Sequence, residues 1–247
     1  MDRLKGKVCI VTGGARGLGL AYCKAMAEQG AKVVIADIAD GHELAGDIGA
    51  TFIHTDVSQP DSAKRCVEET LQKHGSIDVL VNNAALYSTL PMVRYSDIEL
   101  ELWDQVMAVN IRGAFTMIKF VGPVMEAQES GKIINITSGT TYKGMPGMLH
   151  YISSKGALVA MTRALSRELG PKNICVNNLS PGLILSESIL ENQDHVNSAS
   201  DPVLASRAFK RHGYPEDLLG ALLFLASGDS DFVTGQTIAV DGGSINT

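Results

Sequence analysis

The stretch KVCIVTGGARGLG, residues 7–19, joins a run of apolar residues to a cluster of glycines. Residues 7–12 form a short apolar run bounded by glycine, a composition that predicts a buried strand. Residues 20–29 read as a helix that Gly30 closes. Strand, glycine turn and helix in this order predict the first unit of an alternating α/β chain.

The turn between this strand and this helix contains Gly13, Gly17 and Gly19. Glycines let backbone approach a pyrophosphate, and a helix N-terminus supplies N–H donors and the positive end of its dipole. A second strand, residues 32–36, ends at Asp37, about 20 residues beyond the turn, where a carboxylate can bind ribose hydroxyls. This order of features favours a dinucleotide site over a simple chain reversal.

A second constellation consists of Asn110, Ser138, Tyr151 and Lys155. Tyr151 and Lys155 are four positions apart, so on a helix they project from one face. We expect the lysine ammonium to lower the pKa of the phenol and make it a proton donor or acceptor near neutral pH. Ser138 is placed to hold a carbonyl or hydroxyl oxygen. Tyr-x-x-x-Lys alone is common on solvated helix faces, so its weight comes from the dinucleotide pattern that precedes it.

With these motifs in order, residues 4–243 resemble the short-chain dehydrogenase/reductase family. The matching segments are Thr12-Gly13-x-x-x-Gly17-x-Gly19, Asp56-Val57, Asn82-Asn83-Ala84-Ala85, the tetrad Asn110, Ser138, Tyr151 and Lys155, and Pro181-Gly182. Two positions depart from the family pattern: Ala85 replaces a glycine, and Ser186 replaces a threonine but keeps a hydroxyl.

The resemblance implies a role for each residue of the tetrad. Tyr151 exchanges a proton with the substrate oxygen, Lys155 stabilises the phenolate and binds the nicotinamide ribose, and Ser138 hydrogen-bonds the substrate oxygen. Asn110 resembles the residue that positions a water linked to the lysine. A polar residue that only hydrogen-bonds the backbone of a helix would give the same sequence pattern. The implied cofactor-binding residues are Gly13, Arg16, Gly17, Leu18, Gly19, Asp37, Ile38, Asp56, Val57, Asn83, Ala84, Ala85, Tyr151, Lys155, Pro181, Gly182, Ile184 and Ser186.

The choice between NAD and NADP is a question of charge. Asp37 can accept hydrogen bonds from ribose hydroxyls and would repel a 2′-phosphate, and Ile38 offers no positive charge to offset that repulsion. Arg16 points the other way, because many NADP-dependent relatives have a basic residue at this place. Since Asp37 is expected to touch the discriminating hydroxyl, the prediction is NAD, with NADP less favoured.

The alternation of strands and helices predicts one α/β domain over residues 1–247, with a doubly wound parallel sheet and helices on both faces. The resemblance implies seven strands in the order 3-2-1-4-5-6-7. Residues 186–211 are polar and irregular, and we expect a mobile substrate loop there. The further strands are expected at 52–56, 79–81, 132–137, 174–179 and 237–240, and the further helices at 61–74, at 100–129 with breaks near Gly113 and Gly122-Pro123, at 151–169 and at 215–226.

Composition limits the classes of function. A net charge of −6 argues against a general nucleic-acid binder, because there is no basic surplus to neutralise phosphates. The apolar runs are too short for a membrane span, and the first strand begins within seven residues, so no signal peptide is expected. The four cysteines form no Cys-x-x-Cys pair and no zinc spacing, so we expect no metal site and a reducing cytoplasm.

The sequence says less about the substrate than about the cofactor. The loops after strands four and five resemble those of NAD-dependent dehydrogenases of aryl or cyclic secondary alcohols. They contain apolar residues that could line a pocket: Tyr87, Leu90, Tyr142, Met145, Met148 and Leu149. His150 beside Tyr151 reads as a bystander rather than a second acid.

Two other functions stay open. The main enzyme alternative is a 3-oxoacyl-acyl-carrier-protein reductase, which Asp37 disfavours because those reductases generally use NADPH. A dinucleotide-binding sensor or scaffold is the non-enzyme alternative, although all four tetrad positions are filled. The family resemblance also implies a homotetramer joined through residues 100–129, residues 151–169 and the C-terminal segment.

Overall fold

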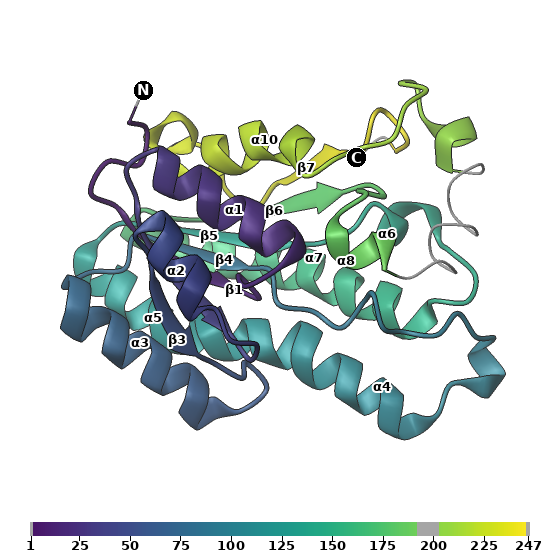
Figure 1. Cartoon of the computed structure of the whole chain (residues 1–247), viewed down its shortest axis with the longest axis horizontal. Coiled ribbons are helices and arrows are strands. Elements are labelled where there is room, and N and C mark those ends of the chain that lie inside the picture. Colours follow the sequence, from purple (N-terminus) through teal and green to yellow (C-terminus); the bar gives the residue numbers. More distant parts are fainter. Residues whose placement is uncertain (1, 192–202, 246–247) are drawn as a thin grey trace.

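Seven parallel strands form one sheet in the order β3-β2-β1-β4-β5-β6-β7 (Figure 1). The structure is a computed structural model and describes residues 2–191 and 203–245. The doubly wound α/β fold and the strand order expected from the sequence are confirmed. The strands are β1 (Val8–Thr12), β2 (Lys32–Asp37), β3 (Thr51–His54), β4 (Val79–Asn82), β5 (Gly131–Ile136), β6 (Ile174–Pro181) and β7 (Thr237–Val240).

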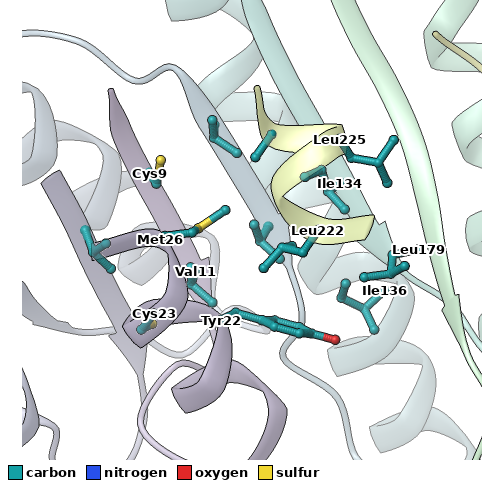
Figure 2. Packing of buried hydrophobic residues seen from close by; sticks show 14 of the residues in the cluster. Cys9, Val11, Tyr22, Cys23, Met26, Ile134, Ile136, Leu179, Leu222 and Leu225 are labelled. Atoms are coloured by element: carbon teal, nitrogen blue, oxygen red, sulfur yellow. The ribbon is translucent and has the colours of Figure 1, made fainter. Parts of the chain in front are cut away.

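Helices cover both faces of this sheet (Figure 1). On one face, α1 (Gly17–Glu28), α2 (His42–Ile48) and α10 (Glu216–Ala226) contribute to one apolar core, in which Met26 and Leu222 lie (Figure 2). On the other face, α3 (Pro60–His74), α5 (Ala114–Gln128) and α7 (Leu149–Leu169) contribute to a second core. Within the described ranges, each helix is either too short or too polar to cross a bilayer.

The apolar run of β1 is explained by burial on two sides. Cys9 and Val11 belong to the core under α1 and α10, whereas Ile10 belongs to the core under α3 and α5. Alternate residues of a strand face opposite sides, so a central parallel strand needs apolar residues at every position. All four cysteines are free and buried, and a buried free cysteine acts as a small apolar residue of the core.

The position of β1 in the sheet determines where a ligand can bind. β1 pairs with β2 on one side and with β4 on the other, so the strand order reverses at β1. In open parallel sheets, a crevice forms at such a reversal, outside the carboxyl ends of the strands. The glycine turn follows β1 at this edge.

Several elements differ from the sequence-based expectations. α1 begins at Gly17, inside the glycine cluster, so Gly17 and Gly19 belong to its first turn. The short helices α2 and α6 (Thr140–Lys143) had not been expected. β6 extends two residues beyond the predicted end, to Pro181, because these residues pair with β7.

The long helical stretch was expected to break twice, and it changes character only once. α4 (Leu100–Met107) passes through a π-helical segment (Ala108–Gly113) into α5, so the irregularity near Gly113 is real. The break expected at Gly122-Pro123 is wrong, because α5 continues through it. Lys119, whose carbonyl loses a donor there, is exposed, and the burial of Val121 and Met125 holds the helix on the sheet.

The segment expected to be an irregular substrate loop is partly helical. α8 (Glu187–Leu190) occupies its start, and residues 203–206 are helical near its end. Residues 192–202 of the expected loop lie outside the described residues.

A chain of buried polar side chains crosses four strands. Asn82 Nδ2 donates to Asn135 Oδ1 (2.9 Å), and Asn135 Nδ2 donates to Thr162 Oγ1 of α7 (2.8 Å). Thr162 Oγ1 donates to Asn178 Oδ1 (2.6 Å), and Asn178 Nδ2 donates to Thr237 Oγ1 (3.0 Å). These bonds attach α7, which carries the Tyr-x-x-x-Lys pair, to the strands beneath it.

Candidate active site

One cavity of about 670 Å³ lies at the carboxyl ends of the strands. Nearly every site residue expected from the sequence lines it, and Asn110 is the exception. The predicted residues in its wall are Gly13, Arg16, Gly17, Leu18, Gly19, Asp37, Ile38, Asp56, Val57, Asn83, Ala84, Ala85, Ser138, Tyr151, Lys155, Pro181, Gly182, Ile184 and Ser186.

The glycine turn forms a cradle that side chains would fill. Gly13 has a φ of 63°, and a Cβ built there would lie 2.8 Å from the Cα of Ala84. A Cβ on Gly19 would lie 1.9 Å from the carbonyl oxygen of Gly13. Asn83 holds the turn, because its Nδ2 donates to the carbonyls of Thr12 and Gly13, both at 3.0 Å. Bare backbone at the start of α1 thus lines the cavity, which fits the pyrophosphate of a dinucleotide.

Asp37 ends β2 beside this cradle and is already held by backbone. Its Oδ2 accepts from the Ala15 N–H and its Oδ1 from the Ala39 N–H, both at 2.9 Å. Each carboxylate oxygen can accept more than one bond, so ribose hydroxyls can still be bound. Arg16 is exposed and has no hydrogen-bond or ion-pair partner in the part of the chain that the structure describes. Ile38 is 67% exposed and brings no charge.

Asp56 and Val57 form the neighbouring part of the wall, after β3. Asp56 Oδ1 accepts from the N–H and the hydroxyl of Ser58, at 2.9 and 2.7 Å, which fixes the carboxylate. Val57 is buried beneath the π-helical segment, where a Cβ on Gly113 would lie 2.7 Å from its Cγ2. The wall at this point is therefore rigid and partly apolar.

The opposite wall comes from the end of β6 and the residues after it. The Gly182 N–H donates to the carbonyl of Val240 (3.1 Å), and a Cβ on Gly182 would lie 2.7 Å from the Cβ of Asp241. Ser186, at the start of α8, is buried in this wall. Pairing with β7 thus delivers the Pro181-Gly182 segment to the cavity.

Tyr151 and Lys155 lie in the first two turns of α7 and are both buried. The Lys155 Nζ donates to the carbonyl of Ile136 at the end of β5 (2.7 Å) and lies 5.7 Å from the centroid of the Tyr151 ring. The ring of Tyr87 packs on the Tyr151 ring with centroids 4.6 Å apart. The Lys155 ammonium is therefore held by the backbone of the sheet.

The direction of the tyrosine pKa differs from the expectation. Burial raises the pKa of the Tyr151 phenol, Tyr87 adds to this rise, and a hydrogen bond with Ser138 opposes it. Burial also lowers the pKa of Lys155 to about 8. Desolvation favours the neutral form of both groups, so the expected lowering of the phenol pKa by the lysine is wrong for this state of the site.

Ser138 lies two residues beyond the end of β5, within hydrogen-bond reach of Tyr151. Its Oγ accepts from the Thr140 hydroxyl (2.9 Å) and from the Thr140 N–H (3.3 Å). With these two donors in place, the Ser138 hydroxyl proton remains for another acceptor. Ser138 and Tyr151 can therefore both donate to one substrate oxygen.

Asn110 lies in the π-helical segment, outside the cavity. Its Nδ2 donates to the carbonyl of Leu86 (3.2 Å) and to Ser154 Oγ (3.0 Å), and its Oδ1 accepts from the Leu86 N–H (2.8 Å). Both amide hydrogens are used, so the side chain fastens the loop after β4 to α7. The expected link to Lys155 through water stays a prediction.

The apolar residues proposed for the substrate pocket divide into two groups. Tyr87 and Met145 line the cavity. Leu90 and Met148 are buried in a separate small core, and Tyr142 and Leu149 are exposed. His150 is buried, and its Nδ1 accepts from the Tyr151 N–H (2.9 Å), so it does not reach the cavity.

Sequence reasoning missed several polar residues of the wall: Lys143, Ser206, Arg207, Asp241 and Ser244. Asp241 follows the last strand, so its place at a strand carboxyl end was a usable signal. Lys143 lies at the end of α6, Ser206 in the helical residues 203–206 and Arg207 directly after them, and none of the three belongs to a motif. Only the folded chain brings them to the cavity.

Comparisons with known proteins agree with the fold and indicate the family. Residues 13–244 match a family model described as Enoyl-(Acyl carrier protein) reductase. The chain is 36% identical to the 3-oxoacyl-acyl-carrier-protein reductase FabG of Thermotoga maritima, across 98% of this chain and 99% of that relative. It is 34% identical to the cyclopentanol dehydrogenase of Comamonas testosteroni, across 98% of each protein.

Proposed function

Because this chain belongs to the short-chain dehydrogenase/reductase family, we propose that it transfers hydride between NAD(H) and a secondary alcohol or ketone, cyclic and aryl alcohols included. One observation carries the proposal. The glycine cradle and Asp37 line the same cavity as Ser138, Tyr151 and Lys155. A dinucleotide along the first group would bring its reacting end to the second group.

The proposed chemistry divides between cofactor and protein. Bound nicotinamide dinucleotide supplies the hydride chemistry. Tyr151 donates a proton to the carbonyl oxygen during reduction and removes it from the alcohol during oxidation. Ser138 holds the same oxygen and stabilises the charge that develops on it. The raised pKa keeps the Tyr151 phenol protonated at neutral pH, which suits the donor role.

Lys155 acts beside the tyrosine in this proposal. Its ammonium, held by the carbonyl of Ile136, stabilises negative charge on the phenolate and hydrogen-bonds the nicotinamide ribose. Because burial lowers its pKa to about 8, Lys155 is still mostly charged at neutral pH.

NAD is the proposed cofactor because of the Asp37 geometry. A buried carboxylate beside the cradle would repel a 2′-phosphate at close range, whereas Arg16 is exposed and has no partner in the described structure. A charge held by two backbone bonds acts at a defined place, so Asp37 outweighs Arg16.

A second candidate is reduction of a 3-oxoacyl thioester with NADPH. The similarity to the Thermotoga maritima reductase, over nearly the full length of both chains, supports it. The same Ser138 and Tyr151 would then act on the 3-oxo group, and Arg16 would bind the 2′-phosphate.

One absorbance screen tests both candidates. NAD(H) and NADP(H) are each tried with aliphatic, cyclic and aryl secondary alcohols and their ketones, sugars and 3-oxoacyl thioesters. We expect NAD-linked turnover of an alcohol. In the Tyr151→Phe variant, kcat should fall by about 100- to 10,000-fold while NAD affinity changes little. Tyr142→Phe, an exposed tyrosine outside the cavity, is the matched control and should keep full activity.

The other outcomes separate the alternatives. A preference for thioesters with NADPH supports the second candidate against the first. Dinucleotide binding without turnover across the panel supports a sensor or scaffold, and a fully active Tyr151→Phe variant contradicts the mechanism. A cytoplasmic homotetramer stays a prediction that the exposed Leu100 and Phe115 support, and sedimentation as a monomer would contradict it.

A further inference from the structure

A cluster of hydrogen-bond donors lies in the cavity wall beyond the tetrad. Lys143 comes from the end of α6, Ser206 from the helical residues 203–206, and Ser244 from the turn after β7. The Lys143 Nζ donates to Ser206 Oγ (2.8 Å) and to Ser244 Oγ, and the two serine oxygens are 2.6 Å apart. All three residues line the cavity that contains Ser138 and Tyr151.

The charge of Lys143 is not neutralised by its immediate neighbours. Among residues 2–191 and 203–245, no carboxylate lies within the 4.0 Å of an ion pair with its Nζ. Partial burial lowers the pKa of Lys143, Asp241 opposes this shift, and Arg207 adds to it. The ammonium is thus bound to two neutral hydroxyls beside a second cation.

Arg207 and Asp241 line the cavity near this cluster and retain unused polar atoms. Arg207 is 3% exposed; its two terminal nitrogens donate to the carbonyls of Arg211 and Leu183, and its Nε has no partner in the described structure. Asp241 is 6% exposed; its Oδ1 accepts from two backbone N–H groups, and its Oδ2 has no partner there. Two cations and one carboxylate leave this wall with one net positive charge.

We propose that Lys143, Ser206 and Ser244 bind a carboxylate on the substrate, so that the substrate pair is a hydroxy acid and the corresponding oxo acid. This inference rests on the proposed function, because it adds a second contact to the molecule that Tyr151 and Ser138 act on. The reacting carbon lies at the tetrad, and the carboxylate lies at the cluster.

Three physical features favour a carboxylate over other groups. An ammonium with two adjacent hydroxyls supplies several donors to the two oxygens of a carboxylate. The nearby charge of Asp241 disfavours a dianion such as a phosphate monoester. Lys143 and Ser138 line the same cavity and are five residues apart in the chain, so one substrate can contact both.

A purely structural role for Lys143 predicts different behaviour. The lysine joins three segments, and if this joining were its function, its loss would impair all substrates alike. Binding of a carboxylate predicts a loss for acids only. Charge dependence therefore separates the two roles.

The experiment compares 3-hydroxybutanoate and 4-hydroxypentanoate with their methyl esters, with NAD as the oxidant. The wild-type protein should prefer the acids in kcat/KM by tenfold or more. Lys143→Met should raise KM for the acids by tenfold or more with little change in kcat, and should leave the esters within about twofold. Lys143→Arg, which retains the charge, should retain most of the preference. Lys210→Met is the matched control, because Lys210 bonds only the carbonyl of the nearby Ala205 among the described residues and does not line the cavity.

Each result has a defined meaning. Esters accepted as well as acids by the wild-type protein, or equal losses for both in Lys143→Met, would overturn the carboxylate site while leaving the alcohol dehydrogenase proposal intact. Absence of turnover with every alcohol and ketone would overturn the proposed function, and the carboxylate site with it.

Discussion

At the scale of the residue, Asp37 has a structural role and, in the proposed function, also selects the cofactor. Its two oxygens accept the N–H groups of Ala15 and Ala39, so the carboxylate both fastens the glycine cradle and presents a negative charge to the cavity. The position after β2 could be read from the sequence, because a strand end and a glycine turn are local patterns. The bond to Ala15 could not, since it joins two loops.

Asp37→Asn should weaken the preference for NAD. The amide removes the charge that repels a 2′-phosphate, so the ratio of kcat/KM for NAD over that for NADP should fall by tenfold or more, about 1.4 kcal/mol for each factor of ten. Steady-state kinetics with both cofactors measure this ratio, and a melting curve checks the fold, because one backbone bond is lost. Asp40→Asn, three residues along the same loop and exposed, should leave the ratio unchanged. If the ratio is unaltered in Asp37→Asn, another residue must determine the cofactor preference.

At the scale of the element, α10 is held at its start by one carboxylate. Asp217 accepts two bonds from Arg211, at 2.6 and 2.7 Å, and one from the Tyr214 N–H, at 2.9 Å. The Arg211 bond and the Tyr214 bond lower the pKa of Asp217 to about 2. The charge also lies in the first turn of the helix, where the dipole favours it.

Asp217→Asn should destabilise the protein at neutral pH by roughly 0.5–1 kcal/mol, since the pair is partly exposed and screened by solvent. The folded-state pKa lies below the ordinary aspartate value, so the charged carboxylate stabilises the fold above about pH 4. This contribution is lost as pH falls from about 4 toward 2, and the difference between variant and wild type should shrink over that window. Urea unfolding at several pH values measures it, and Glu216→Gln, exposed in the same turn, is the control. A difference that is constant with pH would rule out the carboxylate as its source.

At the scale of the whole molecule, the polar chain from Asn82 to Thr237 ties the catalytic helix to the sheet. Thr162 is its centre, because its hydroxyl accepts from Asn135 and donates to Asn178. All three side chains are fully buried. Buried donors and acceptors that lose a partner are costly, so this chain should act as one unit.

Thr162→Val keeps the shape of the side chain and removes both bonds. We expect the free energy of unfolding to fall by about 2–4 kcal/mol, because a donor and an acceptor are left buried without partners. Denaturant unfolding measures the loss. The matched control is Thr116→Val in α5. Within the described part of the chain, the Thr116 hydroxyl bonds only the carbonyl of Arg112 in its own helical stretch (2.7 Å), so the loss should be within about 1 kcal/mol. Equal losses in the two variants would mean that the cross-sheet chain stabilises the protein no more than one bond within a helix does.

The sequence by itself determined the alternation of strands and helices, the glycine turn, the placement of Asp37 and Ser138 at strand ends, and the spacing of Tyr151 and Lys155 on one helix face. These follow from patterns that are local in the chain: apolar runs, glycines at a turn, and residues four apart on a helix. Parallel strands then bring their carboxyl ends together whatever the details of packing.

Only the tertiary structure decided how these groups behave. The pKa of Tyr151 rises because burial desolvates the phenol and the charge interaction with Tyr87 adds to the rise. Asn110 hydrogen-bonds Leu86 and Ser154 outside the cavity. The Lys143 cluster joins three segments that are distant in the chain, and α5 continues through Pro123 because its neighbours bury it. Desolvation and close contact depend on which distant segments meet, and no local pattern in the chain encodes that meeting.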